Sequence, residues 1–369
     1  MKITGATVWQ LDLPLRKPYW LSGGRLKFEV LDSTVLRLET DSGQAGWGEG
    51  CPWGVSYLPA HGRGIRAAFE VLIPAVIGTD PRQLDALNRC MDLALPGHLY
   101  AKSAIDMAAH DIAAQWAGLP LCEFMGAREP HAVPLASSIS TGSVEEMLDD
   151  INRYRDLGYR VHSCKIGEGV AQDIERVERL TAAQRQDEVI YFDANRAWLP
   201  REAMVVMNAV SAVPSWFEQP CETLEQVQAV RQQTTAPICI DENLHTFDDL
   251  RRIQRDGIGE IVNIKINRVG GLTRARQMRD FCLASGLSML VMDTGGSVLA
   301  DTAAAHLAQT IPAAACLGSW SCQEMLTVDP APSLGARHLQ GGFHVPEEPG
   351  LGVSPELSLL GEPFAVYSG

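Results

Sequence analysis

From about residue 131 onward, short apolar runs of strand length alternate with longer stretches whose apolar residues recur at helical spacing. Eight runs are rich in β-branched or aromatic residues, and intervening segments such as "EEMLDDINRYRDLG" have the pattern of amphipathic helices. Eight strand–helix units in about 200 residues predict a (β/α)8 barrel, with a doubly wound open sheet as the structural alternative. The predicted strands are Val133–Ser140, Arg160–Ile166, Val189–Asn195, Ser215–Gln219, Pro237–Glu242, Glu260–Ile266, Ser288–Asp293 and Ala315–Trp320.

The first 130 residues have a different pattern. The segments "ITGATVWQLDL" and "STVLRLETDSGQAGWGEG" alternate apolar and polar residues around Gly- and Asp-rich turns, which predicts an antiparallel sheet. Three helical patterns follow, at about Gly62–Ile77, Pro81–Leu93 and Tyr100–Trp116. We therefore expect an α+β capping domain over residues 1–130, a barrel over residues 131–328, and a Pro- and Gly-rich tail over residues 329–369 that returns to the capping domain.

The strand-like segment "EIVNIKINRVGG" carries a lysine among apolar residues. Successive side chains of a strand point to opposite faces, so Ile264 and Ile266 share one face. Asn263, Lys265 and Asn267 share the other face. An uncompensated ammonium group is costly in an apolar core. The lysine therefore predicts a polar cavity, with carboxylates or a substrate beside it.

Other predicted strands also end in an ionisable residue. In a barrel, the carboxyl ends of the strands form the face that carries the active site. The intervals between these residues are 28, 25, 23, 24 and 28 positions, about one strand–helix unit each. We therefore expect six side chains to converge at one end of the barrel, namely Lys165, Asp193, Glu218, Asp241, Lys265 and Asp293.

The order of these residues indicates their chemistry. Asp193, Glu218 and Asp241 lie on adjacent strands, and three converging carboxylates repel one another unless they are protonated or bind a cation. An all-oxygen site suits a hard ion, above all Mg2+. Lys165 and Lys265 lie on the flanking strands and would face each other across the barrel mouth. A divalent cation and two opposed amines suit proton abstraction next to a carboxylate, followed by epimerisation or by loss of a hydroxyl group.

The stretches "CKIG", "FDAN", "FEQP", "IDEN" and "NIKINRVGGLT" resemble the enolase superfamily, in its muconate-lactonising and mandelate-racemase-like branch. The resemblance extends over nearly the whole chain. It implies a modified (β/α)7β barrel, with an α+β capping domain and without the eighth helix. It also implies one Mg2+ per subunit on Asp193, Glu218 and Asp241, and an acid/base pair formed by Lys165 and Lys265.

Two features depart from the common pattern of that family. Many members with this lysine pair carry Lys-x-Lys on the second strand, whereas this chain has Ser163-x-Lys165. Mandelate-racemase-like members use a histidine on the seventh strand, which here ends in "MDTGGS". The stretches "LSGGR" (Leu21–Arg25), "HSCKIG" (His162–Gly167) and "DTGGS" (Asp293–Ser297) resemble the branch that acts on proline-derived acids, including dehydratases of cis-3-hydroxy-L-proline.

This resemblance implies dehydration of cis-3-hydroxy-L-proline to Δ1-pyrroline-2-carboxylate. In that substrate the hydroxyl group and the α-hydrogen lie on opposite ring faces, which suits two opposed lysines. The alternatives are an epimerase or racemase of a proline betaine, an amino acid or a dipeptide, a lactonising cycloisomerase, and a barrel that binds a ligand without turnover.

Further polar and aromatic residues are candidates for contacting the substrate or for orienting the six strand-end side chains. Asn195 and Glu242 follow strand ends and would orient the carboxylates, since residues beside a metal ligand fix its position. Asp293 and Thr294 would either cap a loop or hold the substrate amine. Two N-terminal loops would close over the mouth as a lid or pack at a domain interface, and their candidates are Trp20, Ser22, Trp53 and Tyr57.

Composition narrows the possible partners. Of 369 residues, 46% are hydrophobic, and the formal net charge is −14. An acidic surface argues against nucleic acid or an anionic membrane as the main partner, and the sequence has no membrane-spanning run or signal-like start. The nine cysteines show no CxxC spacing, which predicts reduced thiols. We expect a cytoplasmic enzyme that acts on a small carboxylate and assembles as a homo-oligomer.

Overall fold

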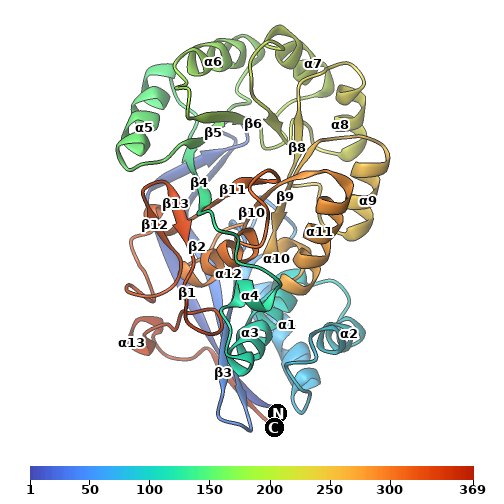
Figure 1. Ribbon diagram of the computed structural model, residues 1–369, viewed down its shortest axis with the longest axis vertical. Coiled ribbons are helices and arrows are strands. Elements are labelled where there is room, and N and C mark those ends of the chain that lie inside the picture. The colour runs from blue at the N-terminus through green and yellow to red at the C-terminus, as the bar shows by residue number, and fades with distance from the viewer.

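The computed structural model describes residues 1–369 and contains a closed barrel of eight parallel strands (Figure 1). The strands follow one another in sequence order, and β11 pairs with β4 to close the barrel. The predicted barrel is therefore confirmed, and the open sheet is excluded. Its strands are β4 (Val133–Ile139), β5 (Val161–Lys165), β6 (Val189–Asp193), β7 (Phe217–Glu218), β8 (Ile238–Ile240), β9 (Ile261–Lys265), β10 (Ser288–Met292) and β11 (Cys316–Trp320).

Helices cover the outside of the barrel, and the side chains that start them explain several of their boundaries. Ser143, Thr223 and Thr246 each form a capping box with the residue three positions later, which satisfies backbone N–H groups at a helix start. No α-helix lies between β11 and the next strand; a single 3-10 turn (Gln323–Met325) takes its place, as the (β/α)7β form predicts. The helices are α5 (Val144–Asp156), α6 (Val170–Ala182), α7 (Pro200–Ala209), α8 (Leu224–Arg231), α9 (Phe247–Arg255), α10 (Ile266–Val269), α11 (Leu272–Ser285) and α12 (Val298–Ala308).

The N-terminal domain combines a four-stranded antiparallel sheet with four helices. Its sheet has the order β14-β1-β2-β3, and helix α3 packs closely against β3. A Cβ atom at Gly48 would lie 1.9 Å from the carbonyl oxygen of Ala104, so this close approach requires glycine. The elements are β1 (Ile3–Leu21), β2 (Leu26–Thr40), β3 (Ala45–Gly50), α1 (Gly62–Val76), α2 (Leu84–Ala94), α3 (Leu99–Ala117), α4 (Leu121–Phe124) and β14 (Ala365–Ser368).

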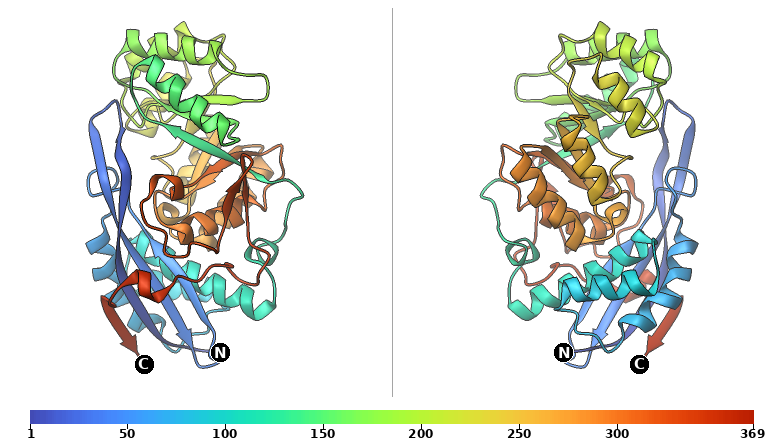
Figure 2. Two further views of the ribbon diagram at one scale, coloured as in Figure 1. Left: turned by 90° about the vertical axis from the view of Figure 1, so that its left-hand side faces the viewer. Right: turned by 90° about the vertical axis from the view of Figure 1, so that its right-hand side faces the viewer.

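The long β1–β2 hairpin runs alongside the barrel (Figure 2). At its tip, the hydroxyl group of Ser22 donates a 2.8 Å hydrogen bond to the carbonyl oxygen of Asn195, which follows β6. The tail of the chain first adds a hairpin, β12 (Arg337–Leu339) and β13 (Gly342–His344), which pairs with the start of β4. After the short helix α13 (Leu357–Leu360) it ends in β14, which pairs with β1. The hairpin tip thus lies at the carboxyl end of β6, and the tail contacts both the barrel and the N-terminal sheet.

Seven of the eight barrel strands end one or two residues earlier than the apolar pattern predicts, and the backbone explains two of these ends. β7 stops at Glu218 because Gln219 has a φ of 38°, a left-handed conformation that breaks the strand. β9 stops at Lys265, and Ile266–Val269 forms one helical turn that ends at Gly270, with a φ of 92°. Asn267 was predicted to share a strand face with Lys265, but it lies in this helical turn. None of the helices combines the length and apolar character that crossing a bilayer requires.

Candidate active site

Three carboxylates and two lysines lie at the carboxyl ends of neighbouring barrel strands, where each lysine pairs with one carboxylate. The strand register sets Lys165 beside Asp193, and Asp193 beside Glu218. Lys165 forms an ion pair with Asp193, and the Nζ atom of Lys265 lies 2.7 Å from Oδ2 of Asp241. All five side chains are buried. The structure therefore brings together the five residues that the sequence placed at strand ends.

Arg268, which the sequence analysis did not single out, completes this cluster. Its guanidinium group donates a 2.6 Å hydrogen bond to Oδ1 of Asp241, and its other bonds go to the carbonyl oxygens of Leu244 and Asn263. The side chain is 1% exposed. The segment "INRVGG" after a buried strand carried the available signal, since an arginine there requires an acidic partner.

The charges around Asp241 and Glu218 are unequal. Burial by itself would raise the pKa of Asp241, but Arg268 and Lys265 outweigh it and lower that pKa below its ordinary value. Burial raises the pKa of Glu218 well above its ordinary value, and the negative charges of Asp193 and Asp241 raise it further. One oxygen of Glu218 accepts a 2.7 Å hydrogen bond from Asn263, which is neutral. The carboxylate of Glu218 therefore lacks a cation in contact with it.

The charges around Lys165 favour its charged form, whereas those around Glu218 disfavour the charged form of that residue. Burial by itself would lower the pKa of this lysine, but the negative charge of Asp193 raises that pKa overall, and Tyr19 and Glu218 act in the same direction. An ammonium group that is paired with a carboxylate retains its proton. The lysine can act as a base only where another cation takes over the charge of Asp193.

The donor chemistry of the three carboxylates fits a hard divalent cation. Their oxygens are the ligands that Mg2+ prefers, and the raised pKa of Glu218 indicates negative charge that the protein alone does not compensate. No group of three His, Cys, Asp or Glu side chains converges closely enough in the structure to hold a metal ion. The ion pairs of Asp193 with Lys165, and of Asp241 with Lys265 and Arg268, occupy oxygens that such an ion would need.

Both lysines line one narrow cavity, with about 60 Å³ of free space. Aromatic side chains from the N-terminal domain and from the barrel also line it, among them Tyr19, Trp53 and Trp320. Trp53 lay in a predicted lid loop, whereas the sequence carried no specific signal for the other two. Of the predicted site residues, those that line the cavity are Tyr57, Lys165, Asp193, Asn195, Glu218, Lys265, Asp293 and Thr294.

The other predicted residues lie outside the cavity wall. Asp241 does not line the cavity itself, but it accepts a hydrogen bond from Lys265, which does. Glu242 accepts a 3.1 Å hydrogen bond from the side chain of Asn195. Burial raises the pKa of Glu242 to about 7, and the negative charge of Asp241 adds to this effect. Ser22 contacts the backbone of Asn195 instead of the cavity. Trp20 is 40% exposed and packs beside the ammonium group of Lys27, so it is not brought to the site.

Asp293 and Thr294, after β10, form the wall of the cavity next to Lys265. Asp293 accepts hydrogen bonds from the backbone of Thr294 and from the backbone and side chain of Asn267. Burial raises the pKa of Asp293 to about 8, although these hydrogen bonds oppose the effect. The hydroxyl groups of Thr294 and Tyr100 lie 2.8 Å apart. This wall is therefore fixed on one side by the barrel and on the other by α3.

Comparison with known families agrees with this geometry. Residues 4–126 match the model of the mandelate racemase/muconate lactonizing enzyme N-terminal domain, and residues 146–358 match the enolase C-terminal domain-like family. The chain belongs to the enolase superfamily. The resemblance expected from the strand-end residues is thereby confirmed, and so is the barrel with its N-terminal domain.

Individual relatives of this enolase superfamily member differ in their activities. It is 38% identical, over the whole of both chains, to a cis-3-hydroxy-L-proline dehydratase of Roseibium aggregatum. It is 28% identical to an N-succinyl-L-Arg/Lys racemase of Bacillus cereus, with 84% of each chain covered. A crystal structure of an enolase superfamily member from Roseovarius nubinhibens, complexed with magnesium, is 52% identical over all of both chains, with a TM-score of 0.96.

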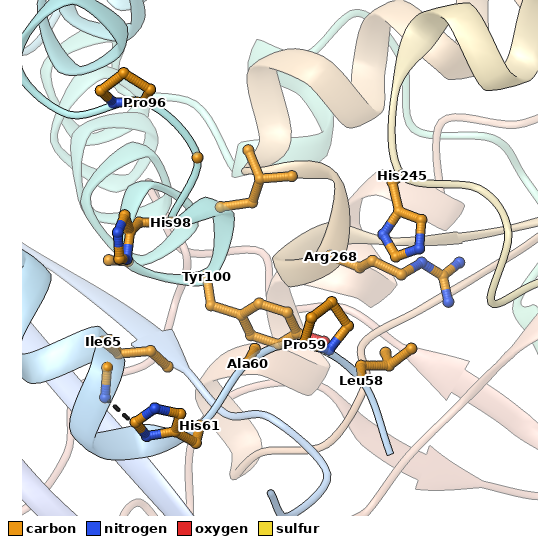
Figure 3. A pocket seen from close by; sticks show the side chains of 14 residues that line it. Leu58, Pro59, Ala60, His61, Ile65, Pro96, His98, Tyr100, His245 and Arg268 are labelled. Atoms are coloured by element: carbon orange, nitrogen blue, oxygen red, sulfur yellow. Dashed lines mark hydrogen bonds between the residues drawn. The ribbon is translucent and has the colours of Figure 1, made fainter. Parts of the chain in front are cut away.

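A second cavity of this superfamily member lies between the N-terminal domain and the barrel (Figure 3). It holds about 440 Å³ of free space and is lined by the starts of α1 and α3, with His61, His98 and His245 around it. Arg268 and Tyr100 line this cavity. Tyr100 bonds to Thr294, which lines the first cavity, whereas Arg268 bonds to Asp241, which does not line it. Neither lysine of the active site reaches the second cavity.

Proposed function

We propose that this protein abstracts the α-proton of a proline-derived carboxylate in an Mg2+-dependent reaction, and that it dehydrates cis-3-hydroxy-L-proline to Δ1-pyrroline-2-carboxylate. The observation that carries the proposal is the position of Lys165 and Lys265, which line one cavity and are each paired with a strand-end carboxylate. The full-length similarity to the dehydratase of Roseibium aggregatum supports the choice of substrate.

Asp193, Glu218 and Asp241 would hold the Mg2+ ion, with one ion per subunit. When bound, the ion supplies positive charge that stabilises the deprotonated form of a substrate carboxylate. Asn195 and Glu242, which bond to each other, would keep this group of carboxylates in position. The related structure that contains magnesium supports the same metal here.

The two lysines would act in sequence on opposite faces of the ring. One lysine, in its neutral form, removes the proton from C2, and the electron pair of that bond is first held by the substrate carboxylate. The same electron pair then forms the C2=C3 double bond as the C3–O bond breaks. The other lysine, as an ammonium group, gives a proton to the departing hydroxyl group, which leaves as water. The resulting enamine tautomerises to the cyclic imine, so the products are Δ1-pyrroline-2-carboxylate and one water molecule.

The shape and polarity of the cavity support a small cyclic substrate. About 60 Å³ of free space and a wall of aromatic side chains suit a five-membered ring better than an extended dipeptide. Asp293 and Thr294 would hold the ring nitrogen, since they form a polar wall next to Lys265. Tyr57 lies above this group, with the ammonium of Lys265 6.0 Å from its ring centre, and would close the cavity from the N-terminal side.

Epimerisation by the same lysine pair is the second candidate function. The observation that favours it is the similarity to the racemase of Bacillus cereus, together with the position of both lysines in the wall of one cavity. Dehydration and epimerisation share the first step and differ in whether the second lysine returns a proton to carbon or gives it to the hydroxyl group. A barrel that only binds its ligand would not require two opposed lysines.

The proposal is tested by incubating the purified protein with Mg2+ and cis-3-hydroxy-L-proline in deuterated water and following the reaction by proton NMR. We expect the substrate signals to disappear as those of Δ1-pyrroline-2-carboxylate appear. Exchange of the α-proton without loss of water, in this acid or in proline or its betaine, would replace dehydration with epimerisation. The absence of both elimination and exchange for all of these acids would refute the proposal.

A further inference from the structure

Trp53 lines the active-site cavity and has a hydrogen-bond donor without a partner. The residue follows β3 in the N-terminal domain, is 4% exposed, and its Nε1 atom contacts no acceptor in the protein. An indole N–H can donate but cannot accept, and a buried donor that stays unpaired lowers stability. Because no protein atom satisfies this group, its partner would be a molecule that enters the cavity.

Neighbouring side chains hold the indole ring in one orientation. The rings of Tyr19, Phe28 and Trp320 surround it edge to face, with centroids 5.6, 6.0 and 5.7 Å away. The backbone of Gly295 packs against the six-membered part of the indole ring. A Cβ atom at position 295 would lie 2.9 Å from the Cε3 atom of Trp53. The ring cannot turn to find another acceptor without disturbing these contacts, so the position of its N–H group is set before any substrate binds.

We propose that the Nε1–H group of Trp53 donates a hydrogen bond to the ring hydroxyl oxygen of the substrate and thereby selects hydroxylated over unhydroxylated cyclic amino acids. This inference rests on the proposed function and deepens it. A donor has two kinds of partner in such a substrate, the carboxylate and the hydroxyl oxygen, because a protonated ring nitrogen accepts nothing. The carboxylate belongs with the strand-end residues on the barrel side, which leaves the hydroxyl group for the N-terminal side.

The bond would also orient the leaving group. A hydroxyl oxygen that accepts from Trp53 has its remaining lone pair available for the proton of the acidic lysine. Trp53 would thus act as a specificity-determining residue, while the proton transfers stay with Lys165 and Lys265. A site built to bond a substrate hydroxyl discriminates strongly against the analogue that lacks it, because its own donor is then left unpaired.

The experiment compares Trp53→Phe with a matched control, Trp216→Phe. Trp216 is also buried with an unpaired Nε1, but it stacks on Tyr191 at 4.7 Å inside the barrel and does not line the cavity. For the wild type and both variants, kcat/KM is measured for cis-3-hydroxy-L-proline with Mg2+. Dissociation constants for this acid and for L-proline are measured by calorimetry at low temperature, and thermal unfolding is followed by circular dichroism.

We expect Trp53→Phe to lower kcat/KM for the hydroxylated acid by about tenfold while the dissociation constant of L-proline changes by less than about twofold, as expected for one lost hydrogen bond. Trp216→Phe should leave both quantities unchanged. Equal losses for both acids, or no loss for the hydroxylated acid, would overturn the role of Trp53. If the wild type binds the hydroxylated acid more tightly than L-proline but forms no product, the dehydratase proposal is refuted. The role of Trp53 is then still tested by whether Trp53→Phe removes that difference in dissociation constants.

Discussion

Glu49, in the N-terminal strand β3, binds the start of barrel helix α12 through Ser297, a residue 248 positions away in the sequence. Its carboxylate accepts hydrogen bonds of 2.9 and 3.0 Å from the backbone N–H of Ser297 and one of 2.8 Å from its hydroxyl group. The backbone N–H of Ala300 adds a fourth, at 3.1 Å. A carboxylate is favoured at a helix start, and this one anchors the loop that carries Asp293 and Thr294.

Glu49→Gln should weaken both the fold and the reaction. The amide keeps one acceptor but turns N–H donors toward the N–H groups of Ser297 and Ala300. We expect the free energy of unfolding to fall by about 2 kcal/mol and kcat to decrease in protein that remains folded. Urea unfolding and initial rates measure the two effects. Glu39→Gln, at an exposed position paired with Arg37, is the control and should have little effect on either. An unchanged kcat in folded Glu49→Gln would contradict the positioning role.

Replacing either active-site lysine by alanine should abolish dehydration, and the two variants should differ in proton exchange. The variant that lacks the base loses exchange of the α-proton with deuterated water, whereas the variant that lacks the acid retains it. Proton NMR of Lys165→Ala and Lys265→Ala therefore assigns the two roles. Lys102→Met controls for the loss of a buried lysine, because Lys102 pairs with Asp92 outside the cavity. Full activity of either alanine variant would refute the mechanism.

Magnesium should stabilise the folded protein whether or not substrate is present. A ligand that binds only the folded state at a concentration one hundred times its Kd adds about 2.7 kcal/mol of stability. We expect Mg2+ to raise the Tm of the wild type, EDTA to reverse the change, and Glu218→Gln to lose most of the response. Potassium chloride at equal ionic strength serves as the control. An equal rise in Tm for the wild type and Glu218→Gln would place the ion elsewhere.

Stability should fall as pH rises through the acidic range because of Asp301, a buried residue of α12. Burial raises its pKa from an ordinary value of 3.8 to about 7, although a hydrogen bond from Ser321 opposes the effect. The folded state therefore holds this proton over a range in which the unfolded state has released it, and this contribution to stability is lost between about pH 4 and pH 7.

Asp301→Asn should remove this contribution while keeping the acceptor for Ser321 and Cys322. We expect the Tm of the variant, relative to that of the wild type, to increase as the pH is raised from about 4 to about 7. Thermal unfolding at several pH values measures the difference. A difference in Tm that does not change with pH would show that Asp301 does not titrate in this range.

The sequence by itself determined the barrel and the residues at its mouth. The alternation of strand and helix patterns is set by neighbours a few positions apart, and one ionisable residue per unit marks the same end of successive strands. Side-chain alternation along β9 correctly assigned Asn263 and Lys265 to the cavity face. It failed beyond Lys265, because a glycine-terminated helical turn places Asn267 by its bonds to Asp293 instead of by strand geometry.

The tertiary structure decided how the cavity is closed and which charges meet inside it. Trp53 and Tyr19 reach the cavity because the N-terminal sheet packs alongside the barrel, and Arg268 bonds to Asp241 of the preceding strand–helix unit. Glu49 meets Ser297 for the same reason. Such contacts depend on how surfaces formed by distant segments fit together, and the local spacing of residues does not encode that fit. The catalytic roles and the metal site stay predictions, which the substitutions above can test.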